Sequence, residues 1–244
     1  MDCAELTAKL VSWIRDRVTA AGADGLVFGM SGGIDSSVMA VLCKMALNDR
    51  ILGLIMPIES HPDDEVYARM VIDKFAIPSR RVALDGVFNA FLKVLPKLSD
   101  DAKVNQIAMA NLKPRLRMTT LYYFANELKY LVAGTGDRSE ITAGYFTKFG
   151  DGGVDIVPLA NLVKSQVREL GTHLGIPKVI VDKPPTPGLW PGQTGEGELG
   201  VSYEELDRFI LTGRATDTVK QRIESLHARS EHKRQMPVAP DFQV

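Results

Sequence analysis

The chain has 244 residues, of which 45% are hydrophobic and 24% charged, and its formal net charge is −1. This composition is that of a globular protein, and the near-zero charge argues against broad binding to nucleic acid. With only Cys3 and Cys43, and with no apolar run of membrane-spanning length, neither a disulfide framework, a cysteine-bound zinc site nor a membrane span is expected. The first residues lack the pattern of a signal peptide, so a cytoplasmic protein is expected.

Apolar periodicity predicts an alternation of helices and strands along the chain. Helices are predicted at 4–20, from 34 onward, and at 62–75, 87–95, 101–126, 162–174, 203–211 and 216–227. Short apolar runs predict strands at 26–30, 51–56, 81–84 and 130–133. Pro114 is expected either to kink the long helical region or to begin a second helix. The alternation indicates an α/β protein with a Rossmann-like, doubly wound parallel sheet, helices on both faces, and a single domain over residues 1–244.

The segment 177–200 has a different character, with prolines at 184, 185, 187 and 191 and five glycines. It is predicted to be a long irregular loop, and such loops are usually functional or disordered. Its spacing Gly195-x-Gly197-x-x-Gly200 matches a dinucleotide-binding fingerprint. No strand is predicted before it, so we interpret this match as chance.

Residues 26–37, LVFGMSGGIDSS, form the most informative segment of the chain. A buried strand, a glycine-rich turn and a helix start would aim free backbone N–H groups at an anion. Ser31, Ser36 and Ser37 add hydroxyl groups, and Asp35 adds a carboxylate that could bind a metal ion beside a phosphate. The alternative is an ordinary strand–turn–helix corner. The segment lacks the Gly-Lys-Ser/Thr of a Walker loop, and it resembles the SGGxDS loop of ATP pyrophosphatases, which cleave ATP between the α- and β-phosphates.

A second glycine-bearing turn, Gly134-Thr-Gly-Asp-Arg-Ser-Glu140, follows the predicted strand at 130–133. The carboxyl edge of a parallel sheet is where ligands bind, so Glu140 is expected at the same edge as Asp35. Two carboxylates together with phosphate oxygens would suit Mg²⁺. The alternative interpretation of Glu140 is an acidic residue that the helix dipole favours in the first turn of a helix.

Two further segments carry charge or aromatic rings. The run 111–118, NLKPRLRM, is either a clamp for a phosphate or carboxylate or a solvated helix face. Residues 144–155 combine aromatic rings, Lys148 and Asp155 among glycines, which indicates either a pocket for a large ligand or a turn-rich hairpin. The four histidines show no metal-ligand spacing and are expected at surface or capping positions. No Ser-His-Asp or Cys-His arrangement is evident, so no covalent nucleophile is expected.

With these segments in the same order over nearly its whole length, the chain closely resembles the ammonia-dependent NAD synthetases. The segment GYFTKFGDGG at 144–153 is the most specific of the motifs, and 158–164, 189–193 and 198–200 add to the match. The resemblance implies a ligase that forms NAD, the last step of NAD biosynthesis, from nicotinic acid adenine dinucleotide (deamido-NAD), ATP and ammonia. It implies two steps, an acyl adenylate formed with release of pyrophosphate and then displacement of AMP by ammonia.

The resemblance also implies roles for individual residues. Asp35 and Glu140 would ligate Mg²⁺. The residues implied to bind ATP are Gly29, Met30, Ser31, Gly32, Gly33, Ile34, Asp35, Ser36, Thr135, Lys164 and Thr186. Those implied to bind deamido-NAD are Arg115, Lys148, Asp155, His232 and Lys233. Segments 144–153 and 184–200 would act as lids, and the protein would be a homodimer with no nucleic-acid or membrane partner.

One departure from the family pattern is Gly195, which stands where the family usually has aspartate in Gln-Thr-Asp-Glu. If that acid binds or deprotonates ammonium, Glu196, Glu198 or another group must replace it. Because only 28 residues precede Gly29, no glutaminase domain is expected, and the chain is expected to use free ammonia or to receive it from a separate subunit. The competing interpretations are another ATP pyrophosphatase, such as a tRNA-modifying or GMP-forming ligase, and a nucleotide sensor without turnover.

Overall fold

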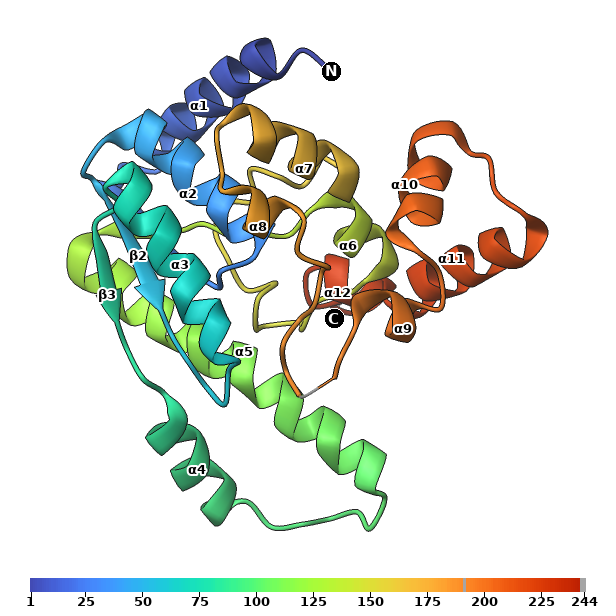
Figure 1. Ribbon diagram of the computed structural model, residues 1–244. Helices are drawn as coiled ribbons and strands as arrows, with labels where there is room; N and C mark the ends of the chain where they lie inside the picture. Colours follow the sequence, from blue (N-terminus) through green and yellow to red (C-terminus); the bar gives the residue numbers. More distant parts are fainter. Residues whose placement is uncertain (191, 242–244) are drawn as a thin grey trace.

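In the computed structural model, which describes residues 1–190 and 192–241, four parallel strands form a sheet with helices on both faces (Figure 1). The strands are β1 (Gly25–Gly29), β2 (Ile51–Ile55), β3 (Ser79–Arg81) and β4 (Tyr130–Val132), in the spatial order β3-β2-β1-β4. The predicted doubly wound parallel α/β sheet is therefore confirmed. Pro191, which belongs to the predicted irregular loop, and the last three residues of the tail lie outside the described residues.

Helices occupy most of the remaining chain, and their bounds follow the predicted ones closely for the longer elements. They are α1 (Cys3–Ala20), α2 (Ile34–Leu47), α3 (Pro62–Phe75), α4 (Asp85–Val94), α5 (Ala102–Leu128), α6 (Arg138–Ala143), α7 (Lys164–His173), α8 (Lys178–Val181), α9 (Gly195–Leu199), α10 (Tyr203–Thr212), α11 (Asp217–Arg229) and α12 (Glu231–Arg234). The helix predicted at 62–75 has the same bounds in the structure.

The two faces of the sheet bury different sets of residues because successive side chains of a strand point to opposite faces. Leu26 and Phe28 of β1 pack into a core with α1, α2, α3 and α7, whereas Val27 packs against α4 and α5. Cys43 is fully buried in the first of these cores, as expected for a small core residue. A third, smaller cluster joins α6 to α10 and α11, which stand at one side of the molecule (Figure 1).

The structure decides one open alternative and corrects two details of the sequence interpretation. The region around Pro114 is one continuous helix, α5, and no second helix begins there. The helices α6, α8, α9 and α12 were not predicted, and α8 and α9 interrupt the supposed irregular loop. The predicted strand at 81–84 lies earlier, at Ser79–Arg81, because its bounds are set by pairing with β2 and not by its own apolar run.

The order of the strands determines where a ligand can bind. The chain runs from β1 outward through β2 to β3, and then returns to place β4 on the other side of β1. The carboxyl ends of β1 and β4 therefore meet at the point where the strand order reverses, which is the usual binding crevice of open α/β sheets. In the described part of the chain, no helix is long and apolar enough to cross a membrane.

Candidate active site

The glycine-rich turn after β1 leads directly into the N-terminus of α2, as predicted. Gly32 has φ of +75°, and a Cβ at this position would lie 2.2 Å from the backbone oxygen of Asp64, so glycine alone fits. The Ser36 hydroxyl donates to the Gly33 carbonyl (3.0 Å) and lies 3.0 Å from the Ser31 hydroxyl. No side chain caps the N-terminus of α2, which leaves its first N–H groups available for an anion.

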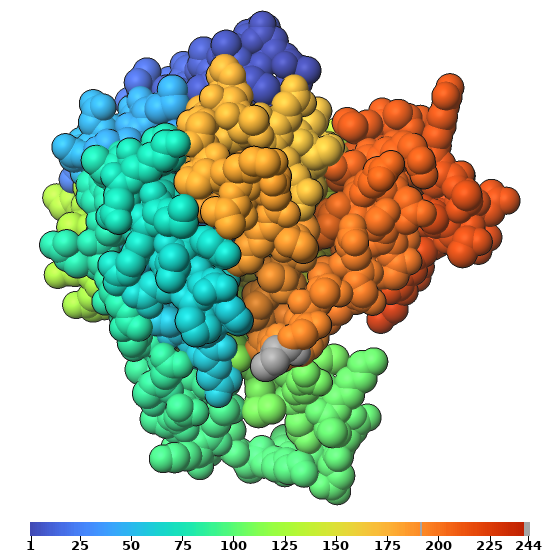
Figure 2. Space-filling view, viewed as in Figure 1, coloured from blue at the N-terminus to red at the C-terminus, as the bar shows by residue number. Residues whose placement is uncertain are grey.

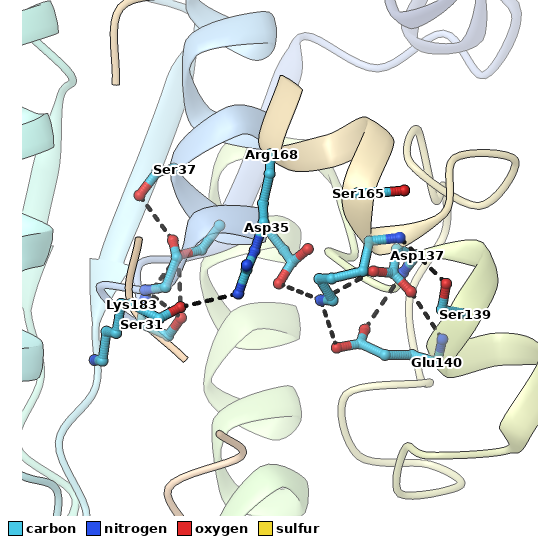
Figure 3. A network of polar contacts seen from close by, with 12 residues as sticks. Ser31, Asp35, Ser37, Asp137, Ser139, Glu140, Ser165, Arg168 and Lys183 are labelled. Carbon is cyan, nitrogen blue, oxygen red and sulfur yellow. Dashed lines mark hydrogen bonds and ion pairs between the residues drawn. The ribbon is translucent and has the colours of Figure 1, made fainter. Parts of the chain in front are cut away.

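Beside this turn, three carboxylates surround the ammonium group of Lys164. Its Nζ lies 2.8 Å from Asp35 Oδ2, 2.9 Å from Asp137 Oδ2 and 3.0 Å from Glu140 Oε1. Figure 3 shows the three acids close together between α2, α6 and α7. The structure therefore brings Asp35 and Glu140 to one edge of the sheet, as the sequence predicted. Lys164 is placed behind them, with its side chain 2% exposed, and does not line the cavity, so its contact with ATP stays a prediction.

Asp137 is the site residue that the sequence analysis did not assign. Its carboxylate caps α6 by accepting from the Glu140 N–H (2.8 Å), and it is fully buried. The Asp-x-x-Glu spacing of a capping box is the signal that could have identified it. Burial raises the pKa of Asp137, and Lys164 only partly offsets this. Burial by itself would lower the pKa of Lys164, but the three carboxylates reverse this and hold it well above its ordinary value.

A cavity of about 710 Å³ opens in front of the glycine-rich turn after β1. Its wall contains the residues predicted at the turn except Gly32, together with Thr135, Glu140, Thr186 and Lys233. The segment 144–154 forms another part of the wall as a series of turns, which supports the pocket interpretation over a hairpin. The segment 183–190 forms a further part and lies beside α3 (Figure 2), where Lys183 Nζ is 2.6 Å from Asp64 Oδ1.

The residues predicted to bind deamido-NAD fall into separate places. Lys233 lines the cavity and donates to the carbonyls of Gly144 and Phe146, each at 2.8 Å. Lys148 donates to the His232 carbonyl, and both residues line a neighbouring hollow of about 370 Å³. Asp155 accepts from the Tyr122 hydroxyl (3.0 Å) and the Val132 N–H (2.7 Å). Arg115 is exposed and donates to the Lys148 carbonyl (3.4 Å), outside the cavity wall.

Arg117, rather than Arg115, is the arginine of α5 that faces the cavity. It donates to the Met56 carbonyl (2.9 Å) and to the Ser60 hydroxyl (3.3 Å). Burial lowers its pKa, and the charges of Asp151, Asp64 and Asp85 oppose this shift. The helical period gave no signal that separates the two arginines, because positions 115 and 117 flank opposite sides of the face formed by the cavity-lining residues Asn111, Pro114, Met118 and Leu121.

Two further sequence interpretations, on the Gly195–Gly200 spacing and on the histidines, agree with the structure. The Gly195–Gly200 spacing lies in the short helix α9 and follows a loop, so it is not a dinucleotide-binding turn. His61 caps α3, and Nδ1 of His227 lies 2.9 Å from the Thr142 carbonyl oxygen, which fits capping and surface roles for the histidines.

Comparison with known proteins agrees with this geometry. Residues 6–237 match the model of the NAD synthase family. The NH(3)-dependent NAD(+) synthetase of Carboxydothermus hydrogenoformans is 46% identical, and the alignment covers 97% of each chain. A solved structure of NMN synthetase from Francisella tularensis has a TM-score of 0.91 and 39% identity, covering 99% of this chain and 100% of that one. The NH3-dependent NAD synthetase from Campylobacter jejuni has a TM-score of 0.81 and 25% identity, with coverage of 99% and 100%.

Proposed function

The chain belongs to the NAD synthase family, and from this premise we propose that it joins ammonia to deamido-NAD with consumption of ATP. The products are NAD, AMP and pyrophosphate, and the reaction is a ligation that forms a carbon–nitrogen bond. The observation that carries this proposal is that the phosphate-binding turn, the acid pair and the segment 144–154 all meet in one cavity.

The chemistry that we propose needs no protein nucleophile. In the first step, an oxygen of the nicotinate carboxylate attacks the α-phosphorus of ATP, and the bond to pyrophosphate breaks. That carboxylate is ionised at neutral pH and is already nucleophilic. The protein positions the two substrates and neutralises charge, through the N-terminal N–H groups of α2 and the hydroxyls of Ser31 and Ser36. In the second step, ammonia attacks the acyl carbon and AMP leaves.

Mg²⁺ is the cofactor that we propose, with Asp35 and Glu140 as its protein ligands. Asp35 Oδ1 is buried without a hydrogen-bond partner, and carboxylate oxygens are the hard ligands that Mg²⁺ prefers. Among residues 1–190 and 192–241, no group of three or more acidic, histidine or cysteine side chains could hold a metal ion alone. Phosphate oxygens of ATP would therefore complete the site, and the bound ion would offset charge on the departing pyrophosphate.

Further contacts with the substrates follow from the positions of the predicted residues. Thr135 and Thr186 line the cavity, which supports their assignment to ATP. Lys164 would reach ATP only by leaving some of its carboxylate partners. Lys233 would contact the part of deamido-NAD inside the cavity. Arg115, Lys148, Asp155 and His232 would contact the part of the dinucleotide that extends beyond it.

We also propose that the protein is a homodimer and works in the cytoplasm. The arm formed by α4 and the first half of α5 extends from the body (Figure 1) and exposes apolar side chains, namely Val87, Phe91, Val94, Val104 and Ile107. Such a patch is typical of a protein interface. Ile107 also lines the cavity, so a second copy on this arm would border the active site.

The test of the function is NAD formation by the purified protein with ATP, Mg²⁺ and deamido-NAD, with ammonium or glutamine in parallel. We expect NAD and an equal amount of pyrophosphate with ammonium. Without ammonium we expect no NAD, and only the pyrophosphate that formation of the adenylate releases, about one per active site, followed by slow release as the adenylate hydrolyses. If the protein forms NAD with neither ammonium nor glutamine, the proposal is contradicted and a nucleotide sensor is favoured.

A second candidate function is the amidation of nicotinic acid mononucleotide to NMN. The observation that favours it is the likeness to a protein described as NMN synthetase, with a TM-score of 0.91. The mononucleotide lacks the adenylate half that Arg115, Lys148 and His232 are proposed to contact. Comparing kcat/KM for the two acceptors separates the candidates, and the charge-removing variant Lys148→Met should lower only the value for deamido-NAD.

A further inference from the structure

Asp207 of α10 is a buried carboxylate to which the proposed reaction assigns no role. The residue is 4% exposed, and a buried carboxylate is costly unless its oxygens accept hydrogen bonds. Its Oδ1 accepts from the Ser139 hydroxyl (2.5 Å), and its Oδ2 accepts from the Ser165 N–H (2.7 Å). Ser139 belongs to α6 and Ser165 to α7, so this single side chain joins α10 to both helices.

Both partners of Asp207 lie in the first turns of the helices that carry the acid cluster. Ser139 is the second residue of α6 and precedes Glu140, whereas Ser165 is the second residue of α7 and follows Lys164 (Figure 3). The Ser139 hydroxyl also accepts from the Lys164 N–H (3.2 Å). The first two N–H groups of α7 are therefore bound by Ser139 and Asp207, which fixes the backbone of Lys164 relative to α6.

The N-cap residue of α7 does not supply these bonds. It is Val163, whose side chain has no oxygen to accept from the first turn. Gln166 is used differently, because its Oε1 accepts from the Val163 N–H (3.1 Å). Buried N–H groups at the start of a helix need an acceptor from elsewhere when the N-cap side chain offers none. Asp207 meets this need from another helix, so the position at which α7 begins depends on α10.

Apolar contacts already hold α10 against its neighbours. Leu206 is fully buried in the cluster that joins α10 to α6 and α11. Tyr203 lies one helical turn before Asp207, and residues four apart share a face of a helix. Lys164 Nζ is 5.4 Å from the centre of the Tyr203 ring, so this face of α10 meets the acid cluster. Attachment of α10 therefore does not require Asp207, and the effect of its two bonds is on how α6 and α7 meet.

We propose that Asp207 is a positioning residue for the acid cluster and, through it, for the first step of the reaction. This inference rests on the proposed function. By joining the first turns of α6 and α7, Asp207 sets the place of Glu140 relative to Lys164, whose Nζ is 3.0 Å from Glu140 Oε1. It also keeps the backbone of Lys164 in place when the side chain turns towards ATP. Loss of the link misplaces Glu140 and weakens the proposed Mg²⁺ site, because residues that orient metal ligands contribute about 10–100-fold to metal affinity or activity.

The test compares Asp207→Asn with a matched control, Glu205→Gln. Asparagine has one oxygen, so it can keep only one of the two bonds of Asp207. Glu205 lies on the same helix, and its Oε2 also accepts two hydrogen bonds, but both come from Ser202 at the start of that helix (3.0 and 2.9 Å). Pyrophosphate release is measured against Mg²⁺ concentration at saturating ATP, deamido-NAD and ammonium. ATP affinity is measured by calorimetry with and without Mg²⁺, in the absence of deamido-NAD.

We expect Asp207→Asn to raise the Mg²⁺ concentration at half-maximal rate by roughly tenfold or more. It should also reduce the gain in ATP affinity that Mg²⁺ gives, and leave the KM for deamido-NAD unchanged. Glu205→Gln should leave all three quantities unchanged. A variant that is only less stable lowers the rate through a smaller folded fraction, and it does not change the Mg²⁺ concentration at half-maximal rate.

An unchanged Mg²⁺ dependence in Asp207→Asn, an equal rise in Glu205→Gln, or an equal rise in the KM for deamido-NAD would overturn the proposal. If Asp207→Asn does not fold, Ser139→Ala removes the hydroxyl that links α6 to α7 and keeps the bond to Ser165. A higher Mg²⁺ requirement is expected there too, and an unchanged one would overturn the proposal. If the wild-type protein forms no NAD, the proposed function fails, whereas the calorimetric comparison still decides the role of Asp207, so the two failures are distinguishable.

Discussion

Replacing Lys164 by methionine removes the one cation at the centre of the acid cluster. Its Nζ lies within 3.0 Å of three carboxylates, and its side chain is 2% exposed while that of Asp137 is 0% exposed. Removing one partner from a buried ion pair costs about 3–5 kcal/mol, because the remaining charge has neither water nor a counter-charge. We expect Lys164→Met to lower the free energy of unfolding by about this amount and to abolish NAD formation.

The assay is urea unfolding followed by far-UV circular dichroism, at equal protein concentration for every variant. The matched control is Lys183→Met, because Lys183 pairs only with Asp64 and both side chains are 22–24% exposed. Its cost should be about 1 kcal/mol or less. Adding Asp137→Asn to Lys164→Met should recover part of the loss by removing an unpaired charge. A loss below about 1 kcal/mol for Lys164→Met, or strict additivity of the two substitutions, would refute this reasoning.

Three further predictions concern the turn, the metal ligands and the cavity wall. Asp35→Ala should reduce NAD formation by at least about 100-fold with little change in circular dichroism, because Lys164 keeps Asp137 and Glu140 as partners, and near-normal turnover would contradict the metal assignment. Gly32→Ala should weaken ATP binding in calorimetry, because the added Cβ meets the Asp64 backbone at 2.2 Å and φ is +75°, and wild-type affinity would count against the turn. Burial raises the pKa of Asp151, so the folded protein holds this proton more tightly than the unfolded chain does. The stability that this proton contributes is present at acidic pH and is lost as pH rises towards neutrality. Asp151→Asn should flatten this decline in urea unfolding from pH 4 to 7, and identical pH profiles would argue against the assignment.

The local part of the site could be predicted from the sequence. An apolar run, two glycines and a helix start within residues 26–37 determine a strand, a turn and an open helix N-terminus through contacts between near neighbours. The same holds for the helix at Pro62–Phe75, where proline in the first turn and apolar periodicity set both ends. Glu140 and Asp35 were expected at one edge because parallel strands end together.

Other features depend on residues distant in the sequence and were decided by the tertiary structure. Pro114 does not break α5, because the helix packs along β1 and β4 and this burial outweighs one lost backbone hydrogen bond. The choice of Arg117 over Arg115 depends on which face of α5 meets the cavity. The short helix α6 is too brief for periodicity to show.

The acid cluster around Lys164 shows most clearly what the sequence determined and what the tertiary structure decided. The sequence by itself predicted that Asp35 and Glu140 follow the ends of two strands, because strand and turn preferences act over a few residues. Only the tertiary structure brought Lys164 to Asp35, which is 129 residues away in the chain, and placed Glu198 in the cavity and Glu196 outside it. Such contacts depend on how α2, α6, α7 and α9 pack around the end of the sheet, and no local preference encodes that packing.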